Sequence, residues 1–342
     1  MVIFRVDANQ YIATGHLMRC ISIAQRFVAH GEFVKFLIAD NNPAVILEKY
    51  GMDYEVLNTK WNVLDYEIVA VKEILQSYNK PLFIIDTYSV TPKYVESLIP
   101  YSKCCYLGGA QVYLGKLYAL INYSVSVNRD FYAQNYGTDT KLILGPKYMP
   151  LREEFMGMHH KTIKTSRCNV LLTTGGSNPN QYIEKILRKI IQSDIFASIE
   201  INLILGGMFK NVESIRDEFG RHTNITMYEN VESMAKIMSQ CDLAITANGS
   251  TVYELAACNV PAITFAMAKD QIQSAEKLYT MHMTEYCGVI YDDENSCIEK
   301  IVDNLIIYIQ SFERRQALAS KAGSLIDGRG CEHIYEALTT NN

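Results

Sequence analysis

The chain has 342 residues, of which 49% are hydrophobic and 20% charged, and its net charge is −5. This length exceeds that of a typical single hydrophobic core, so we expect two domains in an ordinary globular protein. The negative charge argues against nucleic acid as a partner. No apolar run approaches the ~18 residues of a membrane span, and Arg5 and Asp7 come too early for a signal peptide. We therefore expect a cytoplasmic protein without stable membrane insertion.

The cysteines and histidines indicate neither a disulfide framework nor a metal site. The nine cysteines are odd in number and form no Cys-x-x-Cys motif, and their one adjacent pair is Cys104-Cys105. This pattern is typical of buried free thiols in a reducing compartment. His159-His160 is followed by Lys161, without a carboxylate or cysteine at ligand spacing. We expect no metal and no cofactor.

Strand-like apolar runs alternate with helical patterns through the first half of the chain. This alternation is typical of a parallel sheet with right-handed crossovers. The expected strands are 2–7, 34–39, 54–57, 81–86, 103–107 and 119–122, and the expected helices are 15–29, 43–50, 64–78 and 92–99.

A second alternating series follows, with expected strands at 169–173, 199–205, 225–228, 243–246, 262–265 and 288–291. From about residue 296 the pattern gives one long helix, a break at Asp327–Gly330, and a final helix that can pack back on the first domain. The predicted fold class is α/β, with two Rossmann-like doubly wound domains facing each other across a cleft. We place them at residues 1–146 and 167–342, with a linker at 147–166. The sequence gives no indication of the oligomeric state.

Ligands of open parallel sheets bind beyond the carboxyl ends of the strands, so the turns there are candidate sites. After the first strand, Gly15-His16 begins a helix, whose positive end favours a neutral imidazole that can accept a proton near pH 7. The alternative is a surface or capping histidine. After the strand at 81–86, Asp86-Thr87-Tyr88 places a carboxylate and a phenol at the same edge, although Asp86 can instead cap the next segment.

Two turns of the second domain have the features of a phosphate site. Each combines glycines, which permit close backbone approach, with hydroxyl or amide side chains at a helix N-terminus. Glu254, about one turn into its helix, is placed to accept the hydroxyls of a ribose. The residues concerned are Gly175, Gly176 and Ser177 in one turn, and Asn248, Gly249, Ser250 and Thr251 in the other. The alternative is an ordinary strand–helix junction with a solvated Glu254. Neither Gly-x-Gly-x-x-Gly nor a P-loop motif is present.

Six motifs, in order along nearly the whole chain, resemble one family. They are Arg5-Val6-Asp7-Ala8, Gly15-His16-Leu17-Met18-Arg19-Cys20, Ile85-Asp86-Thr87-Tyr88, Leu151-Arg152-Glu153-Glu154-Phe155, Gly175-Gly176-Ser177, and Asn248-Gly249-Ser250 with Glu254. The chain is similar to the hydrolases that remove UDP from UDP-2,4-diacetamido-2,4,6-trideoxy-β-L-altropyranose in pseudaminic acid biosynthesis, and to their spore-coat polysaccharide relatives. The final Asp327-Gly328-Arg329-Gly330-Cys331-Glu332 is similar to a tail of longer members.

This resemblance implies the GT-B architecture and a nucleotide-sugar substrate. By position, the family's catalytic histidine falls on His16, its nucleotide-holding Ser and Glu on Ser250 and Glu254, and its diphosphate-facing turn on Gly175-Gly176. His16 would then activate water against the anomeric carbon, while backbone N–H groups and helix dipoles stabilise the UDP leaving group without a metal. Asp86 and Tyr88 complete the candidate catalytic set, and Gly15, Arg19 and Gln271 are further candidate contacts to the substrate.

Two departures from the family pattern concern the sugar side. Gly108-Gly109-Ala110 stands where the family usually has an acidic pair, and Asp86-Thr87-Tyr88 stands for its Asp-His-Tyr. We expect a changed sugar preference, because carboxylates that bind sugar hydroxyl or amide groups discriminate strongly. Two alternatives to a hydrolase stay open: a GT-B glycosyltransferase, in which an acceptor hydroxyl replaces the water, and a protein that binds a nucleotide-sugar without turnover.

Overall fold

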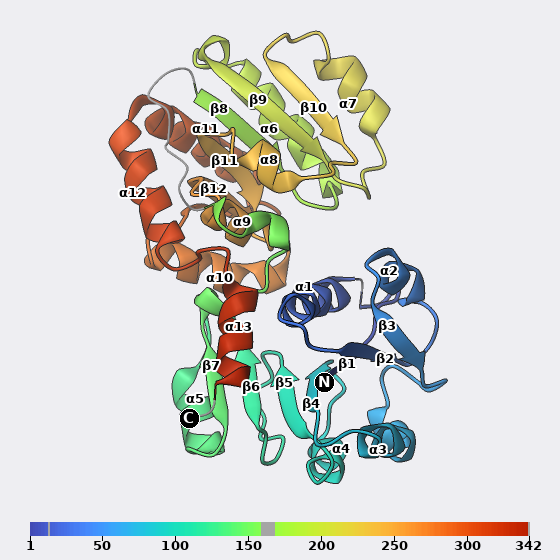
Figure 1. Cartoon of the computed structure of the whole chain (residues 1–342). Helices are drawn as coiled ribbons and strands as arrows, with labels where there is room; N and C mark the ends of the chain where they lie inside the picture. The colour runs from blue at the N-terminus through green and yellow to red at the C-terminus, as the bar shows by residue number, and fades with distance from the viewer. Residues whose placement is uncertain (13, 159–167, 341–342) are drawn as a thin grey trace. The chain divides into compact units, whose positions relative to one another are not determined.

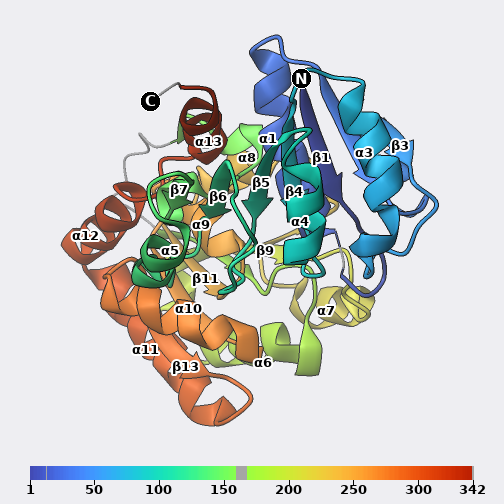
Figure 2. The ribbon, with the colours of Figure 1, turned by 90° about the horizontal axis from the view of Figure 1, so that it is seen from below.

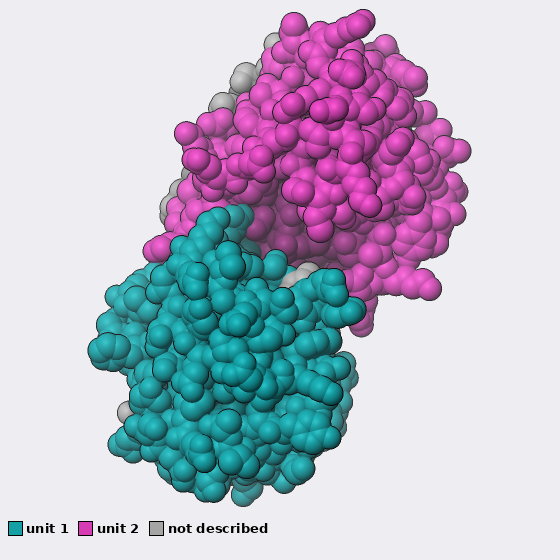
Figure 3. Space-filling view, turned by 90° about the vertical axis from the view of Figure 1, so that its right-hand side faces the viewer, with its two compact units in different colours: residues 1–152, 329–342 teal, residues 153–328 magenta. Residues whose placement is uncertain are grey.

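The computed structural model describes residues 1–12, 14–158 and 168–340 (Figure 1). The chain forms two compact units, coloured separately in Figure 3. Unit 1 comprises Met1–Arg152 together with Arg329–Asn342, and unit 2 comprises Glu153–Gly328. The last helix of the chain thus belongs to unit 1. The part of the predicted linker that contains His159 and His160 lies outside the described residues.

Unit 1 contains a parallel seven-stranded sheet in the order β3-β2-β1-β4-β5-β6-β7. The order reverses between β1 and β4, which are direct neighbours, and this reversal is the point where ligands of such sheets bind. The strands are β1 (Val2–Val6), β2 (Val34–Ile38), β3 (Asp53–Val56), β4 (Leu82–Asp86), β5 (Lys103–Leu107), β6 (Ala119–Asn122) and β7 (Lys141–Leu144).

Helices cover both faces of this sheet, and each face has its own hydrophobic core. One core joins the sheet to α1, α2 and α13, and the other joins it to α3, α4 and α5. Figures 1 and 2 show α3 and α4 together on one face. The helices are α1 (Gly15–Ala29), α2 (Ala44–Lys49), α3 (Ile68–Gln76), α4 (Pro92–Leu98), α5 (Arg129–Tyr136) and α13 (Gly330–Thr339).

Unit 2 contains a parallel six-stranded sheet in the order β10-β9-β8-β11-β12-β13, which reverses between β8 and β11. Its main core is formed by the apolar faces of α6, α7, α11 and α12 against the strands. The strands are β8 (Cys168–Thr173), β9 (Ile199–Leu205), β10 (Ile225–Glu229), β11 (Leu243–Ala247), β12 (Ala262–Ala266) and β13 (Glu285–Val289). The helices are α6 (Tyr182–Ile191), α7 (Val212–Phe219), α8 (Met234–Met238), α9 (Thr251–Ala257), α10 (Lys269–Thr280), α11 (Glu294–Gln310) and α12 (Phe312–Gly323).

The predicted fold class of two doubly wound parallel sheets is confirmed, whereas several elements differ from the prediction. The expected long C-terminal helix is wrong: Ser311 is extended, and its hydroxyl accepts a hydrogen bond from the Arg314 N–H, which ends α11 and caps α12. The strand expected at 288–291 is misplaced: β13 spans Glu285–Val289, and Gly288 lies within it at φ +106°. The helix expected at 64–78 starts as the 3₁₀ turn η1 (Leu64–Glu67), in which Glu67 points inward.

Helix α5 and strand β7 were not predicted. The Asn128 side chain caps α5, and its buried side chains are Tyr132 and Tyr136. Tyrosines contribute little to a hydrophobic pattern, although their rings pack in the core of unit 1. Strand β7 lies at the sheet edge and is only four residues long.

Candidate functional site

The point where the strand order reverses in unit 1 carries a histidine–carboxylate pair. His16 lies in the first turn of α1, and Asp86 is the last residue of β4. The His16 Nδ1 atom lies 2.5 Å from Asp86 Oδ1, and both side chains are buried. The fold therefore brings together two of the three predicted catalytic residues, which lie 70 positions apart in the chain.

Several donors hold the carboxylate of Asp86. Arg19, one turn after His16 on α1, donates from Nε to Oδ2 at 2.5 Å and from Nη2 to Oδ1, and the Cys20 thiol donates to Oδ2 at 3.3 Å. Burial by itself raises the pKa of Asp86, but the Arg19 guanidinium and the hydrogen bonds from His16 and Arg19 outweigh it and hold this pKa below its ordinary value. Asp86 is therefore a carboxylate whose two oxygens are both engaged by hydrogen bonds within the protein.

This arrangement fixes the tautomer of His16. An ionised carboxylate only accepts hydrogen bonds, so Nδ1 carries the proton that points to Asp86. Arg19 Nη2 also lies 3.0 Å from Nδ1, but it donates to the same, stronger acceptor on Asp86. The lone pair is left on Nε2, which is the arrangement of a general base oriented by a carboxylate.

Tyr88 stands beside this pair. Its ring is 78% exposed and packs edge-on against the His16 imidazole, with ring centroids 4.6 Å apart. Gly15 begins α1 just before His16, and a Cβ there would meet no atom within 4 Å. Gly15 is thus not required by local packing.

Tyr123 is a site residue that the sequence analysis missed. It follows β6 at the same edge of the sheet, and its hydroxyl accepts a hydrogen bond from Arg19 Nη1 at 2.6 Å. Asp86 and Tyr123 together engage three nitrogens of the Arg19 guanidinium. This geometry favours a positioning role for Arg19 over the expected contact with substrate. The sequence contained one signal that could have identified Tyr123, namely its position directly after the predicted strand 119–122.

The glycine turn after β5 is shaped by Tyr106. A Cβ at Gly108 would lie 2.4 Å from the Tyr106 hydroxyl, whereas a Cβ at Gly109 would meet only the Asn122 amide, at 3.8 Å. The following Ala110 carbonyl accepts a hydrogen bond from the Tyr132 hydroxyl at 3.1 Å. A side chain is therefore excluded at 108 while Tyr106 keeps this position, whereas a Cβ is accommodated at 109.

In unit 2, Gly175 and Gly176 follow β8 next to the reversal of strand order. Gly175 has φ +82°, and its N–H donates to the Thr173 hydroxyl at 3.1 Å. Gly206, after β9, packs directly beneath this turn: a Cβ there would lie 2.1 Å from the Gly175 carbonyl oxygen. Gly206 is thus required by close backbone packing, which the sequence analysis did not foresee. The turn is closed by Thr174, whose hydroxyl donates to the Ser177 carbonyl at 2.7 Å.

The neighbouring turn, after β11, leads into α9. Ser250 occupies the N-cap position, as expected, but its side chain makes no capping hydrogen bond within α9. Gly249 and the exposed Ser250 precede Thr251, the first residue of the helix. The Asn248 and Gly249 N–H groups donate to the Phe265 and Ala247 carbonyls, which leaves the N–H groups of Ser250 and Thr251 as the candidate donors of this turn. Glu254 lies one turn into α9 and is half-buried.

Asn248 and Gln271 connect this turn to α10. The Asn248 amide nitrogen donates to the Ser274 hydroxyl at 3.0 Å, and Gln271 Oε1 accepts from the Met267 N–H at 3.0 Å. The Asn248 Oδ1 atom is buried and has no hydrogen-bond partner among the described residues. A buried acceptor without a partner costs roughly 1–3 kcal/mol, which a ligand donor at this position would recover.

Two further findings concern the described residues as a whole. They contain no group of three or more His, Cys, Asp or Glu side chains placed to hold a metal ion. None of their helices is long and apolar enough to cross a bilayer.

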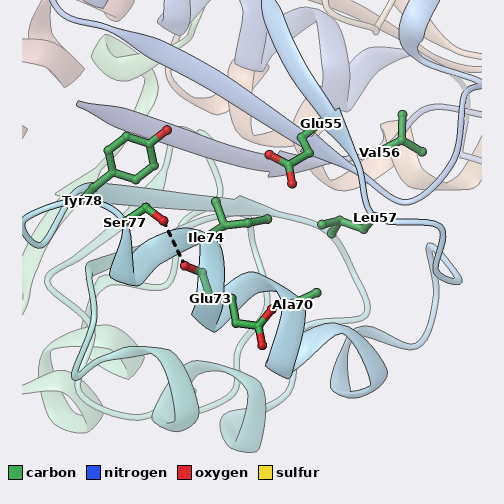
Figure 4. A pocket seen from close by; sticks show the side chains of 8 residues that line it. All are labelled: Glu55, Val56, Leu57, Ala70, Glu73, Ile74, Ser77 and Tyr78. Atoms are coloured by element: carbon green, nitrogen blue, oxygen red, sulfur yellow. Dashed lines mark hydrogen bonds between the residues drawn. The ribbon is translucent and has the colours of Figure 1, made fainter.

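A pocket of about 440 Å³ lies between β3 and α3, and it includes none of the candidate site residues (Figure 4).

The comparisons with known proteins can now be set beside this geometry. Residues 170–325 match the family described as "Glycosyltransferase family 28 C-terminal domain". Among solved structures, MurG of Acinetobacter baumannii aligns over 98% of both chains at 15% identity with a TM-score of 0.66. UDP-GlcNAc 2-epimerase of Neisseria meningitidis, bound to UDP-GlcNAc, aligns over 100% of both chains at 13% identity with a TM-score of 0.67. The chain has the GT-B fold. This confirms the fold predicted from the family resemblance.

Three curated relatives share 23–25% sequence identity with the chain. The chain is 23% identical to the uncharacterized protein MJ1062 of Methanocaldococcus jannaschii over 97% of its length, and 25% identical to the spore coat polysaccharide biosynthesis protein SpsG of Bacillus subtilis over 58%. It is 23% identical, over 84% of its length, to the Helicobacter pylori "Pseudaminic acid cytidylyltransferase and UDP-2,4-diacetamido-2,4,6-trideoxy-beta-L-altropyranose hydrolase". The chain spans 65%, 58% and 48% of these three proteins. The family resemblance is therefore supported as a distant similarity.

Proposed function

We propose that this protein is a nucleotide-sugar hydrolase that releases UDP from a UDP-linked amino or deoxy sugar. The observation that carries the proposal is the His16–Asp86 pair, because it leaves Nε2 of His16 as a proton acceptor at the ligand-binding edge of unit 1. The distant similarity to the Helicobacter pylori hydrolase and the GT-B fold support the substrate class.

In this proposal His16 takes a proton from water as the water oxygen attacks the anomeric carbon. The new carbon–oxygen bond forms as the bond between the anomeric carbon and the diphosphate oxygen breaks, and UDP departs with the electron pair. The proton moves to Nε2, and Asp86 stabilises the resulting imidazolium through Nδ1. Tyr88, in edge contact with the imidazole, forms one side of the space open to the reacting groups.

Unit 2 holds the nucleotide in the same proposal. The turns at 175–177 and 248–251 follow the adjacent strands β8 and β11 at one edge of the sheet. The N–H groups of Gly176, Ser177, Ser250 and Thr251 donate hydrogen bonds to the diphosphate. Glu254 accepts hydrogen bonds from the ribose. The unpaired Asn248 Oδ1 adds an acceptor for a donor group of the ligand.

The sugar preference follows from the turn after β5. Gly108 and Gly109 carry no carboxylate, so we infer that the altrose donor is processed poorly and that another UDP-linked sugar is preferred. Because a Cβ is accommodated at 109 but not at 108, Gly109→Asp is the variant that tests this. We expect it to raise kcat/KM for the altrose donor relative to other UDP-sugars. A wild-type enzyme that favours the altrose donor over every competitor would refute the inference.

A glycosyltransferase is the second candidate, and the match of unit 2 to the family 28 C-terminal domain favours it. An acceptor hydroxyl would then replace the water beside His16. The two functions are separated by incubating the protein with a panel of UDP-sugars without acceptor and measuring UDP and free sugar. A hydrolase releases both in equal amounts over many turnovers, whereas a transferase does so only when an acceptor is added.

A further inference from the structure

Unit 1 carries a pair of aromatic rings at the edge of the sheet that bears its candidate base. Tyr11 lies in the loop between β1 and α1, which leads directly to His16, and Trp61 lies in the loop after β3. Their rings are stacked with centroids 6.3 Å apart and an interplanar angle of 16°. Tyr11 is nevertheless 75% exposed. Both loops follow the carboxyl ends of strands in one parallel sheet, so the pair stands at the same edge as the His16–Asp86 pair.

The loop of Tyr11 is held in a defined conformation. The Asn9 side chain accepts hydrogen bonds from the backbone N–H groups of Tyr11 at 2.9 Å and Ile12 at 3.2 Å. At the root of this loop, Asp7 Oδ1 accepts from the Ala39 N–H at 2.7 Å. The Tyr11 ring is therefore exposed on a structured loop and is not merely a side chain at a free end.

The loop of Trp61 is fixed to the same framework. The Thr59 N–H donates to the Ala39 carbonyl at 2.9 Å, and the Thr59 hydroxyl donates to Glu67 Oε2 at 2.9 Å. Ala39 thus contacts the roots of both loops, through its N–H to Asp7 and through its carbonyl to Thr59.

A buried ion cluster connects the beginning of the Tyr11 loop, at Asp7, to Glu67, which binds the Trp61 loop. Arg5, fully buried in β1, donates to Asp7 Oδ2 at 2.5 Å and to both oxygens of Glu67 at 2.6 and 3.0 Å. Burying three charges costs several kcal/mol per ion in desolvation, and well-packed apolar residues often give equal stability. The contribution of this cluster is geometric: it sets the position of the Tyr11 loop through Asp7 and of the Trp61 loop through Glu67 and Thr59.

We infer that Tyr11 and Trp61 form a stacking subsite for a pyranose ring. One face of a pyranose presents C–H groups, more so in a deoxy sugar, and an exposed aromatic face covers such a surface while the hydroxyls stay solvated. The position on the loop that leads to His16 places the sugar, and not the nucleotide, at this subsite. The inference rests on the proposed function and adds where the sugar ring is held.

Trp61 provides a direct reporter, because it is the single tryptophan of the chain. We expect its fluorescence to change on titration with UDP-N-acetylglucosamine or with the UDP-linked diacetamido altrose, and to stay unchanged with UDP alone. The same titration with free N-acetylglucosamine at millimolar concentration shows whether the subsite also binds a sugar that is not linked to UDP. A fluorescence change indicates a sugar bound after cleavage or as acceptor, and no change indicates a sugar bound only as part of the donor. A response to UDP alone equal to that of the UDP-sugars would assign the rings to the base and overturn the subsite, as would no response to any of the sugars.

Kinetics of Tyr11→Ala give the second measurement. Loss of one stacking face should raise KM for the UDP-sugar about 5- to 30-fold with kcat changed much less, and leave UDP affinity unchanged. Phe33→Ala is the matched control, since Phe33 is 81% exposed but precedes β2 at the opposite edge of the sheet. If UDP release proceeds with an unchanged KM in Tyr11→Ala, the subsite is wrong while the hydrolase proposal stands. If no UDP-sugar is turned over but Trp61 still responds to the sugars, the hydrolase proposal fails and the subsite stands.

Discussion

The two units present different kinds of chemistry at the same structural position, the reversal of strand order at the carboxyl edge of a parallel sheet. In unit 1 this edge is built from titratable side chains, namely His16, Asp86 and Arg19, which are fixed by hydrogen bonds between α1 and β4. In unit 2 it is built from backbone and hydroxyl groups in glycine-containing turns, with Gly206 packed against the turn at 175–176.

In the proposed function, this difference separates proton transfer in unit 1 from anion binding in unit 2. A proton acceptor needs a defined tautomer, which the carboxylate of Asp86 provides. A diphosphate needs several N–H donors in fixed positions, which turns and helix ends provide without a charged side chain. Substitution of His16 or Asp86 in unit 1 should therefore lower kcat, and substitutions in the turns of unit 2 should weaken nucleotide binding. The predictions below test this division.

The largest expected effect is that of His16→Asn on turnover. Loss of a general base should lower kcat by roughly 10²-fold or more, while UDP affinity measured by calorimetry stays the same. His282→Asn is the control, because His282 is exposed and has φ +56°, which Asn adopts readily. Normal turnover of His16→Asn would leave His16 with only a structural role.

The next effect is on nucleotide binding in unit 2. Glu254→Ala should weaken UDP binding by roughly 1–3 kcal/mol through loss of charged hydrogen bonds to the ribose. Glu213→Ala, an exposed glutamate in the first turn of α7, serves as control. The affinity is read by calorimetry, and an equal Kd in Glu254→Ala and wild type would remove Glu254 from the nucleotide site.

A paired glycine experiment tests whether backbone geometry makes the phosphate site. Gly206→Ala should weaken UDP binding and lower the free energy of unfolding by roughly 1–3 kcal/mol, because its Cβ would overlap the Gly175 carbonyl oxygen. Gly207→Ala should leave both quantities nearly unchanged, since a Cβ at 207 meets nothing within 4 Å. Equal behaviour of the two variants would show that the 175–176 turn tolerates movement and does not define the site.

The smallest expected effect is on stability at acid pH. The pKa of Asp86 lies below its ordinary value of 3.8 in the folded chain, so its stabilising contribution is complete above that value and is lost as the pH falls below it. Denaturant unfolding of wild type and Asp86→Asn should therefore show a difference in free energy of unfolding that shrinks as the pH falls from 5 toward 3. A difference that stays constant or grows over this range would contradict the ionised Asp86 described here.

The sequence predicted six of the seven strands of unit 1, five of the six strands of unit 2 near their observed positions, and the turns that carry His16, Asp86, Gly175 and Ser250, because apolar periodicity and glycine positions are local signals. It did not predict that the Arg19 guanidinium donates hydrogen bonds to the Asp86 carboxylate. That contact joins α1 to β4, and it depends on the register of β1 and β4. The role of Gly206 was likewise hidden, since it arises from contact with the backbone of another turn.

Tyrosines explain why α5 was not predicted. Tyr132 and Tyr136 supply the buried face of α5, and their hydroxyls hydrogen-bond the Ala110 and Val112 carbonyls of the loop after β5. A residue with both apolar and polar contacts gives a weak hydrophobic pattern, so neither α5 nor its contacts with the loop was predicted.

The central claim, that unit 1 directs water to the anomeric carbon while unit 2 releases UDP, is tested most directly by turnover in oxygen-18 water without acceptor. The UDP-sugar that the protein cleaves fastest is used, and both products are analysed by mass spectrometry. The account predicts repeated turnover with the label in the hydroxyl at the anomeric carbon of the free sugar, none in UDP, and little product from His16→Asn. Label in the phosphate of UDP, or no release until an acceptor is added, would contradict it.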